Sequence, residues 1–314
     1  MSSTRCCIAG GGPAGMMLGL LLARAGVDVT VLEKHGDFFR DFRGDTVHPS
    51  TLEVMYELGL LGEFLKRPHD KATELRVTVG KEEAAIADFT GLKTRCGFIA
   101  LMPQWEFLDF LRDHAQLYPG FHLMMNTEVT GLVERDGRVC GVRARTVDGE
   151  SEIAADLVVA CDGRRSTLRG AAGFTVNNLG APIDVLWMRI SKQPADTGGT
   201  GGRIGTGSFL AIIDRGSYWQ TAFVIAKGGM EKIKAAGLAA FRKRMVELVP
   251  MFSGRIDADL AGWDNVKLLS VSVDRLEQWW QPGLLCIGDA AHAMSPIGGV
   301  GINLAVQDAV AAAN

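Results

Sequence analysis

The stretch CCIAGGGPAG, residues 6–15, decides how this chain folds. Its apolar first half predicts a buried strand, and its glycines form G-x-G-x-x-G where a helix over residues 14–25 begins. A second apolar run, residues 27–32, ends in Glu33. A strand, a glycine turn, a helix and a strand with a terminal acid, at this spacing, are typical of a unit that binds a dinucleotide.

Each position of this unit has a physical role. Gly10 allows the tight turn, Gly12 lets the backbone approach a pyrophosphate, and Gly15 lets the helix pack on the strand. The amides at the helix N-terminus then face the phosphates. Glu33, at the end of the second strand, is placed to accept hydrogen bonds from ribose hydroxyls.

Two other interpretations compete for the same residues. Residues 6–23 carry no charge and are long enough for a membrane span, but three consecutive glycines and a proline lie inside this window. Arg5, the apolar stretch and the sequence Ala-Arg-Ala at residues 23–25 would also fit a signal peptide. Neither alternative explains a following strand that ends in Glu33, so we expect no transmembrane segment.

Composition sets the outer bounds. A chain of 314 residues, 47% hydrophobic and 22% charged, has room for two globular domains or one large one. The net charge of -3 gives no global attraction to nucleic acid or anionic lipid. The 6 cysteines are scattered without a C-x-x-C pair, and several lie in apolar runs. We therefore expect reduced core cysteines, no metal site and a cytoplasmic protein.

The region after the first unit is polar before it becomes helical. Residues 38–47 are rich in arginine, and Pro49 opens a helical pattern that extends to Leu61. Taken alone, Arg43 is better explained as a solvated loop charge than as part of a site. Residues 72–90 predict two strands around a Gly-Lys turn, and a further amphipathic helix follows.

The middle of the sequence predicts a β-meander over residues 124–160, with two Asp-Gly hairpin turns. Its last apolar run leads directly into Asp162 and Gly163 and then into several arginines, among them Arg164 and Arg169. Clustered positive charge at the end of a strand indicates a nearby anion. A solvated helix start explains the same residues equally well.

Residues 181–270 have a different character. Three runs, 183–190, 208–214 and 219–226, alternate like strands of a sheet, and residues 238–249 predict a helix. No nucleotide motif occurs there. A second, mostly antiparallel module inserted into the first is the most economical interpretation.

The cofactor pattern returns late in the sequence. An apolar strand leads into Gly288 and Asp289, and a glycine-rich loop from Pro296 opens a helix at Asn303. A helix N-terminus suits an anion or a polarised ring. Asp289 is placed to bond a polyol hydroxyl, whereas His292 is better explained as a core or capping histidine than as a general base.

These three regions together resemble the para-hydroxybenzoate hydroxylase-like family, the FAD-dependent (class A) aromatic monooxygenases and their relatives in ubiquinone biosynthesis. The family carries G-x-G-x-x-G, then a D-G motif near the middle and a G-D motif late, and this sequence has all three in that order. The resemblance implies an α/β protein with a Rossmann-like FAD-binding domain and an inserted, mostly antiparallel β-sheet substrate domain. The FAD-binding domain is expected at residues 1–72, 97–180 and 270–314, and the substrate domain at 73–96 and 181–269.

The resemblance also implies how FAD is held, without a covalent bond. The glycine turn and Glu33 would hold the ADP half, Asp289 the ribityl-pyrophosphate region, and the loop from Pro296 would lie along the isoalloxazine ring. Arg43 matches the arginine of a flexible loop beside the flavin, so Arg43 and Pro296 are the catalytic candidates. The cofactor-binding candidates are Gly10, Gly12, Pro13, Ala14, Gly15, Glu33, Lys34, Arg43, Gln104, Val129, Asp162, Gly163, Arg164, Arg169, Gly288, Asp289, Pro296, Gly298, Gly299, Gly301, Ile302 and Asn303.

The implied activity uses NAD(P)H and O₂. The nicotinamide cofactor reduces FAD, and the reduced flavin takes up O₂ as a C4a-hydroperoxide whose distal oxygen attacks an electron-rich carbon. We expect hydroxylation of an aromatic or polyketide-like small molecule, in a pocket between the inserted sheet and the loop near Pro296.

Three alternatives stay open to different degrees. A flavin halogenase of the same fold is disfavoured because its Trp-x-Trp-x-Ile-Pro signature is missing, and residues 279–282 do not fit it. An FAD-dependent reductase of an unsaturated lipid would share the FAD motifs. The sequence stops at Asn314 within a helical pattern, where family members usually continue with helices that cover the active site. The third alternative is therefore a truncated flavin-binding protein without turnover. The sequence does not indicate the oligomeric state.

Overall fold

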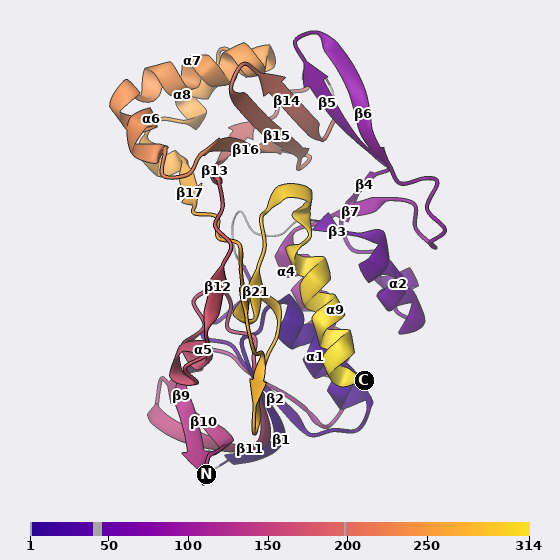
Figure 1. The fold of residues 1–314 in the computed structure, drawn as a ribbon. Coiled ribbons are helices and arrows are strands. Elements are labelled where there is room, and N and C mark those ends of the chain that lie inside the picture. Colours follow the sequence, from indigo (N-terminus) through magenta and orange to yellow (C-terminus); the bar gives the residue numbers. More distant parts are fainter. Residues whose placement is uncertain (1, 40–45, 198) are drawn as a thin grey trace.

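The structure, a computed structural model, describes residues 2–39, 46–197 and 199–314. Two large sheets dominate it, an eight-stranded sheet beside the N-terminus and a seven-stranded sheet at the far end of the molecule (Figure 1). Two three-stranded sheets lie between them. Within the described ranges, no helix is long and apolar enough to cross a membrane.

The centre of the eight-stranded sheet is parallel. Its strands run in the order β20-β11-β1-β2-β8, and neighbours in this order are parallel. All of β2 is buried, as expected for a parallel strand that is covered on both faces. These strands are β1 (Ser2–Ala9), β2 (Val29–Leu32), β8 (Phe121–Met124), β11 (Gly149–Ala160) and β20 (Leu284–Cys286).

An antiparallel meander completes this sheet. Strands β9 (Glu128–Arg135) and β10 (Arg138–Thr146) lead into β11, and the edge strand β19 (Trp280–Gln281) pairs with β20. The β9–β10 turn has a positive φ at both Asp136 (50°) and Gly137 (72°), the conformation of a type I′ hairpin. The predicted Asp-Gly turn is confirmed here.

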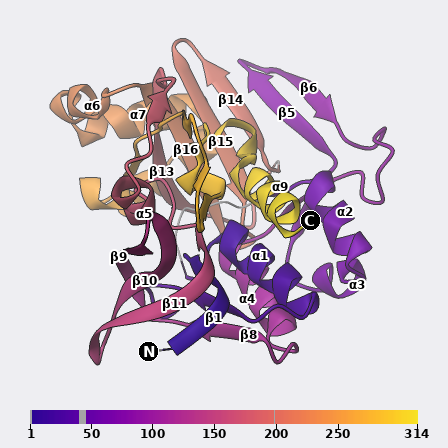
Figure 2. The same ribbon diagram turned by 60° about the horizontal axis from the view of Figure 1, so that its bottom comes forward.

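Three helices pack against the parallel strands. Both views show α1 (Pro13–Arg24) beside α9 (Gly301–Ala313), and α1 also packs on α4 (Gln104–Ala115) (Figures 1 and 2). The predicted helices at α1 and α4 are confirmed. Helix α9 begins two residues before the predicted Asn303, because the backbone already adopts helical geometry at Gly301.

The predicted helix from Pro49 to Leu61 is divided in the structure. Helix α2 (Pro49–Glu57) ends before Gly59, whose φ of 77° is a left-handed conformation, and α3 (Leu61–Phe64) follows. The Gly59 amide donates to the Tyr56 carbonyl (2.9 Å) and the Leu60 amide to the Met55 carbonyl (2.8 Å), which is a Schellman motif. The glycine therefore terminates the helix that the apolar periodicity alone extended too far.

The seven-stranded sheet collects strands from two distant parts of the sequence. Its order is β17-β13-β16-β15-β14-β5-β6, and only the β14–β5 pair is parallel. The predicted hairpin around Gly80 is confirmed as β5–β6. The strands are β5 (Glu74–Val79), β6 (Glu82–Asp88), β13 (Ile183–Ser191), β14 (Gly201–Gly205), β15 (Ser208–Asp214), β16 (Tyr218–Ala226) and β17 (Lys267–Leu269).

The two faces of this sheet differ. One face packs under helices through Leu186, Met188 and Phe223, in a cluster that includes Phe241 and Met245 of α7. The helical layer comprises α6 (Met230–Ala236), α7 (Leu238–Leu248), η1 (Pro250–Phe252), α8 (Ile256–Asp259) and η2 (Trp263–Asn265).

Side chains alternate along each strand, so the opposite face carries a second apolar cluster built on Val185 and Ala222, with Trp187 packed against it. This face is turned toward the N-terminal βαβ unit, and the loop before α9 rises toward it (Figure 1). The intervening small sheets are β3 (Thr46–Val47), β7 (Ile99–Leu101) and β4 (Asp70–Ala72), and β12 (Val176–Asn178), β18 (Asp274–Leu276) and β21 (His292–Ala293).

Candidate functional site

In the glycine turn between β1 and α1, two of the three motif glycines have no room for a side chain, and the third faces open space. Gly10 has a φ of 109°, and a Cβ there would lie 2.4 Å from the Cys161 carbonyl oxygen. A Cβ at Gly15 would lie 2.0 Å from the Gly10 carbonyl oxygen. At Gly12 a Cβ would meet no described atom within 4 Å. Packing therefore requires Gly10 and Gly15, whereas the open space lies at Gly12, in front of the helix.

This space faces the N-terminus of a long helix. Helix α1 begins at Pro13, its N-cap Gly12 provides no side-chain cap, and its first turn, which is fully described, holds no acidic residue. The first amides of the helix are thus available to an anion, and the helix dipole favours negative charge at this end. Ala14 is buried, so it supports the turn by packing.

Glu33 lies at the carboxyl end of β2, next to the glycine turn. Its Oε2 accepts a hydrogen bond from the Gly11 amide (3.0 Å), and its Oε1 accepts one from the His35 amide (3.0 Å). The residue is 9% exposed, whereas the neighbouring Lys34 is exposed. These two bonds orient Glu33 beside the glycine turn, and a carboxylate oxygen can accept more than one hydrogen bond.

Asp162, predicted from the D-G motif, caps a helix in the structure. Its Oδ1 accepts from the Ser166 hydroxyl (2.5 Å), and its Oδ2 accepts from the amides of Thr167 (2.7 Å) and Leu168 (3.2 Å). These amides begin α5 (Thr167–Ala171), and Gly163, with a φ of 84°, forms the turn before it. Asp162 therefore organises this segment through two backbone amides and the Ser166 hydroxyl.

The two arginines after this turn reach the late G-D motif. Arg164 Nε donates to Asp289 Oδ2 at 3.2 Å, across 125 positions of sequence. Arg169 donates to the carbonyls of Ala290 (3.3 Å) and Arg164 (2.5 Å), and its guanidinium lies 3.6 Å from Asp274. The D-G and G-D motifs are thus brought together. Arg164 and Arg169 already have protein carboxylates as partners, which the sequence did not indicate.

The loop before α9 contains two glycines with positive φ. Pro296 precedes the short helix η4 (Ile297–Gly299), in which Gly298 and Gly299 have φ values of 79° and 62°. The Thr46 hydroxyl donates to the Gly299 carbonyl at 2.6 Å, and a Cβ at Gly299 would lie 2.0 Å from that hydroxyl oxygen. The loop is therefore fastened to β3, and Pro296 remains half-exposed above it.

Asn303 holds the same region from inside α9. Its Oδ1 accepts from the His48 amide and the Thr51 hydroxyl, both at 2.8 Å, and its Nδ2 donates to the carbonyls of Thr46 and Gly299, both at 3.1 Å. Both amide protons are used, and the residue is 3% exposed. Its role in the structure is to join α9, α2 and the loop.

The remaining predicted residues lie around this centre. Gln104 is the half-buried first residue of α4, Val129 is half-buried on β9, and Ile302 is buried in the core beneath α9. Gly301 is the exposed first residue of α9. Arg43 lies outside the described residues.

His48 is a residue that the sequence reasoning missed. It precedes the first turn of α2, and burial lowers the pKa of its imidazole despite a contact with the Gly298 backbone. Its Nε2 is buried and has no hydrogen-bond partner among the described residues. The only local signal was its position before a helix-opening proline.

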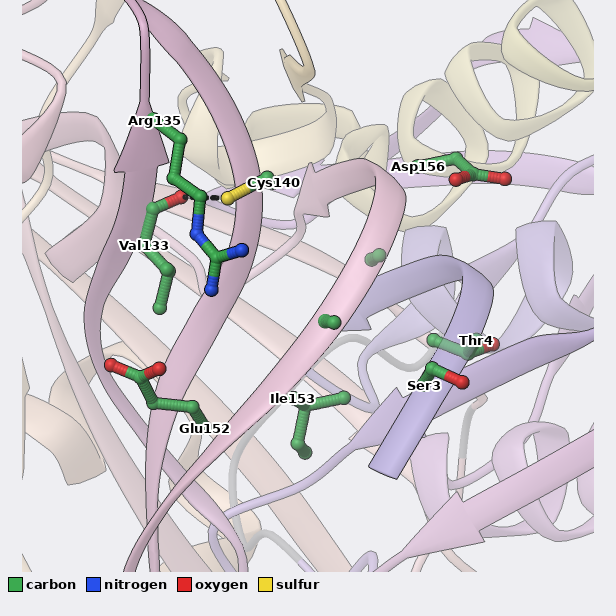
Figure 3. A pocket seen from close by; sticks show the side chains of 10 residues that line it. Ser3, Thr4, Val133, Arg135, Cys140, Glu152, Ile153 and Asp156 are labelled. Atoms are coloured by element: carbon green, nitrogen blue, oxygen red, sulfur yellow. Dashed lines mark hydrogen bonds between the residues drawn. The ribbon is translucent and has the colours of Figure 1, made fainter. Parts of the chain in front are cut away.

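A cavity of about 250 Å³ lies at the other end of the parallel sheet, between the start of β1 and the meander (Figure 3). Ser3, Thr4, Arg135, Cys140 and Glu152 are among the residues around it. In sheets of this kind, ligands bind at the carboxyl ends of the strands, which is the end that carries the glycine turn. This cavity is therefore separate from the candidate site.

Comparison with known proteins decides the family. A family profile described as an FAD binding domain matches residues 3–314. The chain belongs to this family. As a flavoprotein, it uses FAD as its cofactor, and its class is FAD-dependent monooxygenase.

Two curated relatives and one solved structure illustrate the likeness. The flavoprotein is 33% identical over 98% of its length to 6-methylpretetramide 4-monooxygenase of Streptomyces rimosus, covering 74% of that protein. It is 29% identical over 96% of its length to rifampicin monooxygenase of Streptomyces venezuelae, and the match covers 61% of that protein. A solved structure is that of PqsL, a probable FAD-dependent monooxygenase from Pseudomonas aeruginosa. It superposes on 99% of the flavoprotein and 85% of the PqsL chain with a TM-score of 0.80. The sequence identity is 23%, so this likeness shows the fold.

The residues of this flavoprotein fit FAD. The open space at Gly12 and the uncapped start of α1 suit the pyrophosphate, and the Glu33 carboxylate lies next to this turn. Asp289, whose side chain is 39% exposed beside Arg164, can accept from a polyol hydroxyl. The half-exposed loop at Pro296 and the start of α9 can face a flavin ring.

Proposed function

We propose that this flavoprotein hydroxylates an aromatic, polyketide-like small molecule, with NAD(P)H as reductant and O₂ as oxidant. One observation carries the proposal: the likeness to 6-methylpretetramide 4-monooxygenase extends over 98% of the chain, including the sheet that would bind the substrate. The overall reaction would consume one NAD(P)H, one proton and one O₂, and would release NAD(P)⁺, water and the hydroxylated product. FAD supplies hydride acceptance and dioxygen activation when it is bound.

The sheet organisation supports a division of labour along the sequence. We propose that residues 1–72, 97–180 and 270–314 bind FAD, because they contain the parallel sheet and all three FAD motifs. Residues 73–96 and 181–269 would form the substrate domain, since β5 and β6 join the sheet of β13–β17.

Within the FAD site we propose two kinds of residue. Glu33, Asp289 and the first amides of α1 would bind FAD directly, because Glu33 lies beside the glycine turn, the Asp289 side chain is 39% exposed, and the first amides of α1 face the open space at Gly12. Asp162, Arg169 and Asn303 would act by holding those groups in place, because their polar atoms are already bonded to protein partners.

The substrate would lie between the loop at Pro296 and the face of the seven-stranded sheet that is opposite its helical layer. On this face the half-buried Trp187 packs against buried Val185 and Ala222, which gives an apolar wall suited to a flat apolar molecule. The small sheet of β4 and β7 packs on the same side through Ile213 and would close one end. Such a wall excludes water from the flavin, which protects reduced flavin from unproductive oxidation.

The test is NAD(P)H oxidation by the purified, FAD-loaded protein, with and without a panel of polycyclic phenols. We expect a substrate to accelerate NAD(P)H consumption and product mass to increase by one oxygen atom derived from labelled O₂. NAD(P)H-dependent reduction of a lipid double bond without oxygen incorporation would instead favour the reductase alternative. FAD binding with no NAD(P)H consumption under any condition would indicate a flavin-binding protein without turnover.

A further inference from the structure

We propose that Asp308 and His292 form a positioning pair that holds the Gly288–Asp289 turn against FAD, and that the charge of this pair sets how tightly FAD binds. The inference rests on the FAD site that the proposed function uses. It concerns two residues that the sequence motifs do not assign to the cofactor.

Three separate elements meet at one carboxylate oxygen. Oδ2 of Asp308, in the middle of α9, accepts from His292 Nε2 at 2.7 Å and from the Gly288 amide at 2.8 Å. His292 belongs to β21, and Gly288 begins η3 (Gly288–Ala290). The side chains of His292 and Asp308 are 14% and 17% exposed, so water competes weakly for these bonds.

The turn held in this way touches both helices that point toward FAD. Gly288 has a φ of 60°, and a Cβ there would lie 3.0 Å from Ala14 Cβ of α1 and 3.7 Å from Ala305 Cβ of α9. The next residue, Asp289, is the candidate polyol ligand. A change in the Asp308 contacts would therefore move Asp289 and the first turn of α1 relative to each other.

The charges around His292 favour its protonated form, with the exposed Arg275 of β18, which aligns with His292, as the opposing positive charge. Asp308 on α9 contributes most, Asp289 on η3 and Asp274 on β18 act in the same direction, and together they outweigh burial, so the pKa of His292 is raised. The two more distant carboxylates are shared with arginines of the D-G segment, Asp289 with Arg164 and Asp274 with Arg169.

The ring of Trp279 covers the imidazole, with the two ring centroids 5.2 Å apart. The protonated pair is neutral overall, and its hydrogen bond is charge-assisted.

Loss of the His292 proton changes both the net charge of the pair and the strength of its hydrogen bond. The bond from His292 to Asp308 becomes an ordinary one, and the Asp308 carboxylate adds an unbalanced negative charge beside the site of an anionic pyrophosphate. Because the folded-state pKa is raised, the stabilisation is complete below about pH 6.5 and is lost as the pH rises through the raised value. If FAD binds the protonated pair more tightly, as proposed, FAD affinity falls over the same interval and bound FAD raises the pKa of His292 further.

The first experiment measures FAD affinity by flavin fluorescence quenching of the apo-protein, from about pH 6 to about pH 9, a range that includes and exceeds the ordinary histidine pKa. We expect affinity to fall by about 3- to 10-fold across the His292 titration, the difference between a charge-assisted and a neutral hydrogen bond. His292→Gln should remove this step. Asp308→Asn should shift it to lower pH.

The control variant is His122→Gln. His122 also pairs with an aspartate, Asp28, at 3.2 Å, but this pair is exposed and remote from the FAD motifs. His122→Gln should keep the wild-type pH dependence. An unchanged step in His292→Gln, or pH-independent affinity of the wild-type protein, would overturn the proposal.

A second measurement needs no variant and so does not depend on whether one folds. NMR titration of the His292 imidazole with and without FAD should show a higher pKa in the FAD complex, because linkage between proton and FAD is reciprocal. An identical His292 titration in both states would refute the coupling. Neither experiment uses substrate or NAD(P)H, so failure here leaves the proposed hydroxylation standing, and failure of hydroxylation leaves this result standing.

Discussion

Substituting Asn303 separates a residue that binds FAD from one that builds the FAD site. The structure gives its amide four protein hydrogen bonds, at 2.8, 2.8, 3.1 and 3.1 Å. Asn303→Ala deletes all four hydrogen bonds. Asn303 and Thr51 are only 3% and 1% exposed, so water cannot replace these bonds without rearrangement. At about 1 kcal/mol net for each bond, the apo-protein should lose about 2–4 kcal/mol of unfolding free energy.

The assay is urea unfolding of the apo-protein, followed by tryptophan fluorescence. Thr51→Val removes one of the four bonds and should cost about 1 kcal/mol. Asn177→Ala, on the exposed strand β12, is the matched control and should leave the unfolding free energy within about 0.5 kcal/mol of wild type. Wild-type stability of apo Asn303→Ala combined with weakened FAD binding would refute this reasoning and make Asn303 a direct ligand.

Three further outcomes are expected. Glu33→Ala should weaken FAD affinity by about 10- to 100-fold in a fluorescence titration, since a charge-assisted bond to the ribose is lost; unchanged affinity would contradict its placement. Gly15→Ala should yield little folded, FAD-binding protein, judged by circular dichroism and bound flavin, because its Cβ would lie 2.0 Å from the Gly10 carbonyl oxygen; a folded yellow protein would contradict this contact. Burial raises the pKa of Cys7 and Cys286 to about 12, so iodoacetamide at neutral pH should modify them only after denaturation, as checked by mass spectrometry; rapid labelling of the native protein would contradict their burial.

Some features could be predicted because they depend on residues that are close in sequence. The φ of 109° at Gly10 and the contact of Gly15 with the Gly10 carbonyl oxygen arise within one short turn, and the type I′ hairpin needs only Asp136 and Gly137. The helix-capping role of Asp162 is equally local, since the bonds go to residues four to six positions later. The resemblance implies a cofactor role for Asp162, and that role stays a prediction.

Other features depend on how the sheets bring distant segments together. Asn303 meets His48 across 255 positions, and Arg164 meets Asp289 across 125. Neither pairing has a signal in spacing or periodicity, because it follows from strand order and from the packing of α9. For the same reason the sequence could mark His292 only as a core or capping residue, without indicating Asp308 as its partner.

The parallel pairing of β14 with β5 has a consequence for how the protein is made. Gly202 aligns with Val77, so the strand at residues 74–79 finds its partner only after more than a hundred further residues have left the ribosome. Until then, β5 and β6 form an isolated hairpin, which is marginally stable in water and has open hydrogen-bonding edges. Synthesis of this protein therefore includes an interval in which the early hairpin can associate with other polypeptides. Slow translation between these segments, or low chaperone capacity, should reduce the soluble yield more than it reduces the stability of the finished molecule.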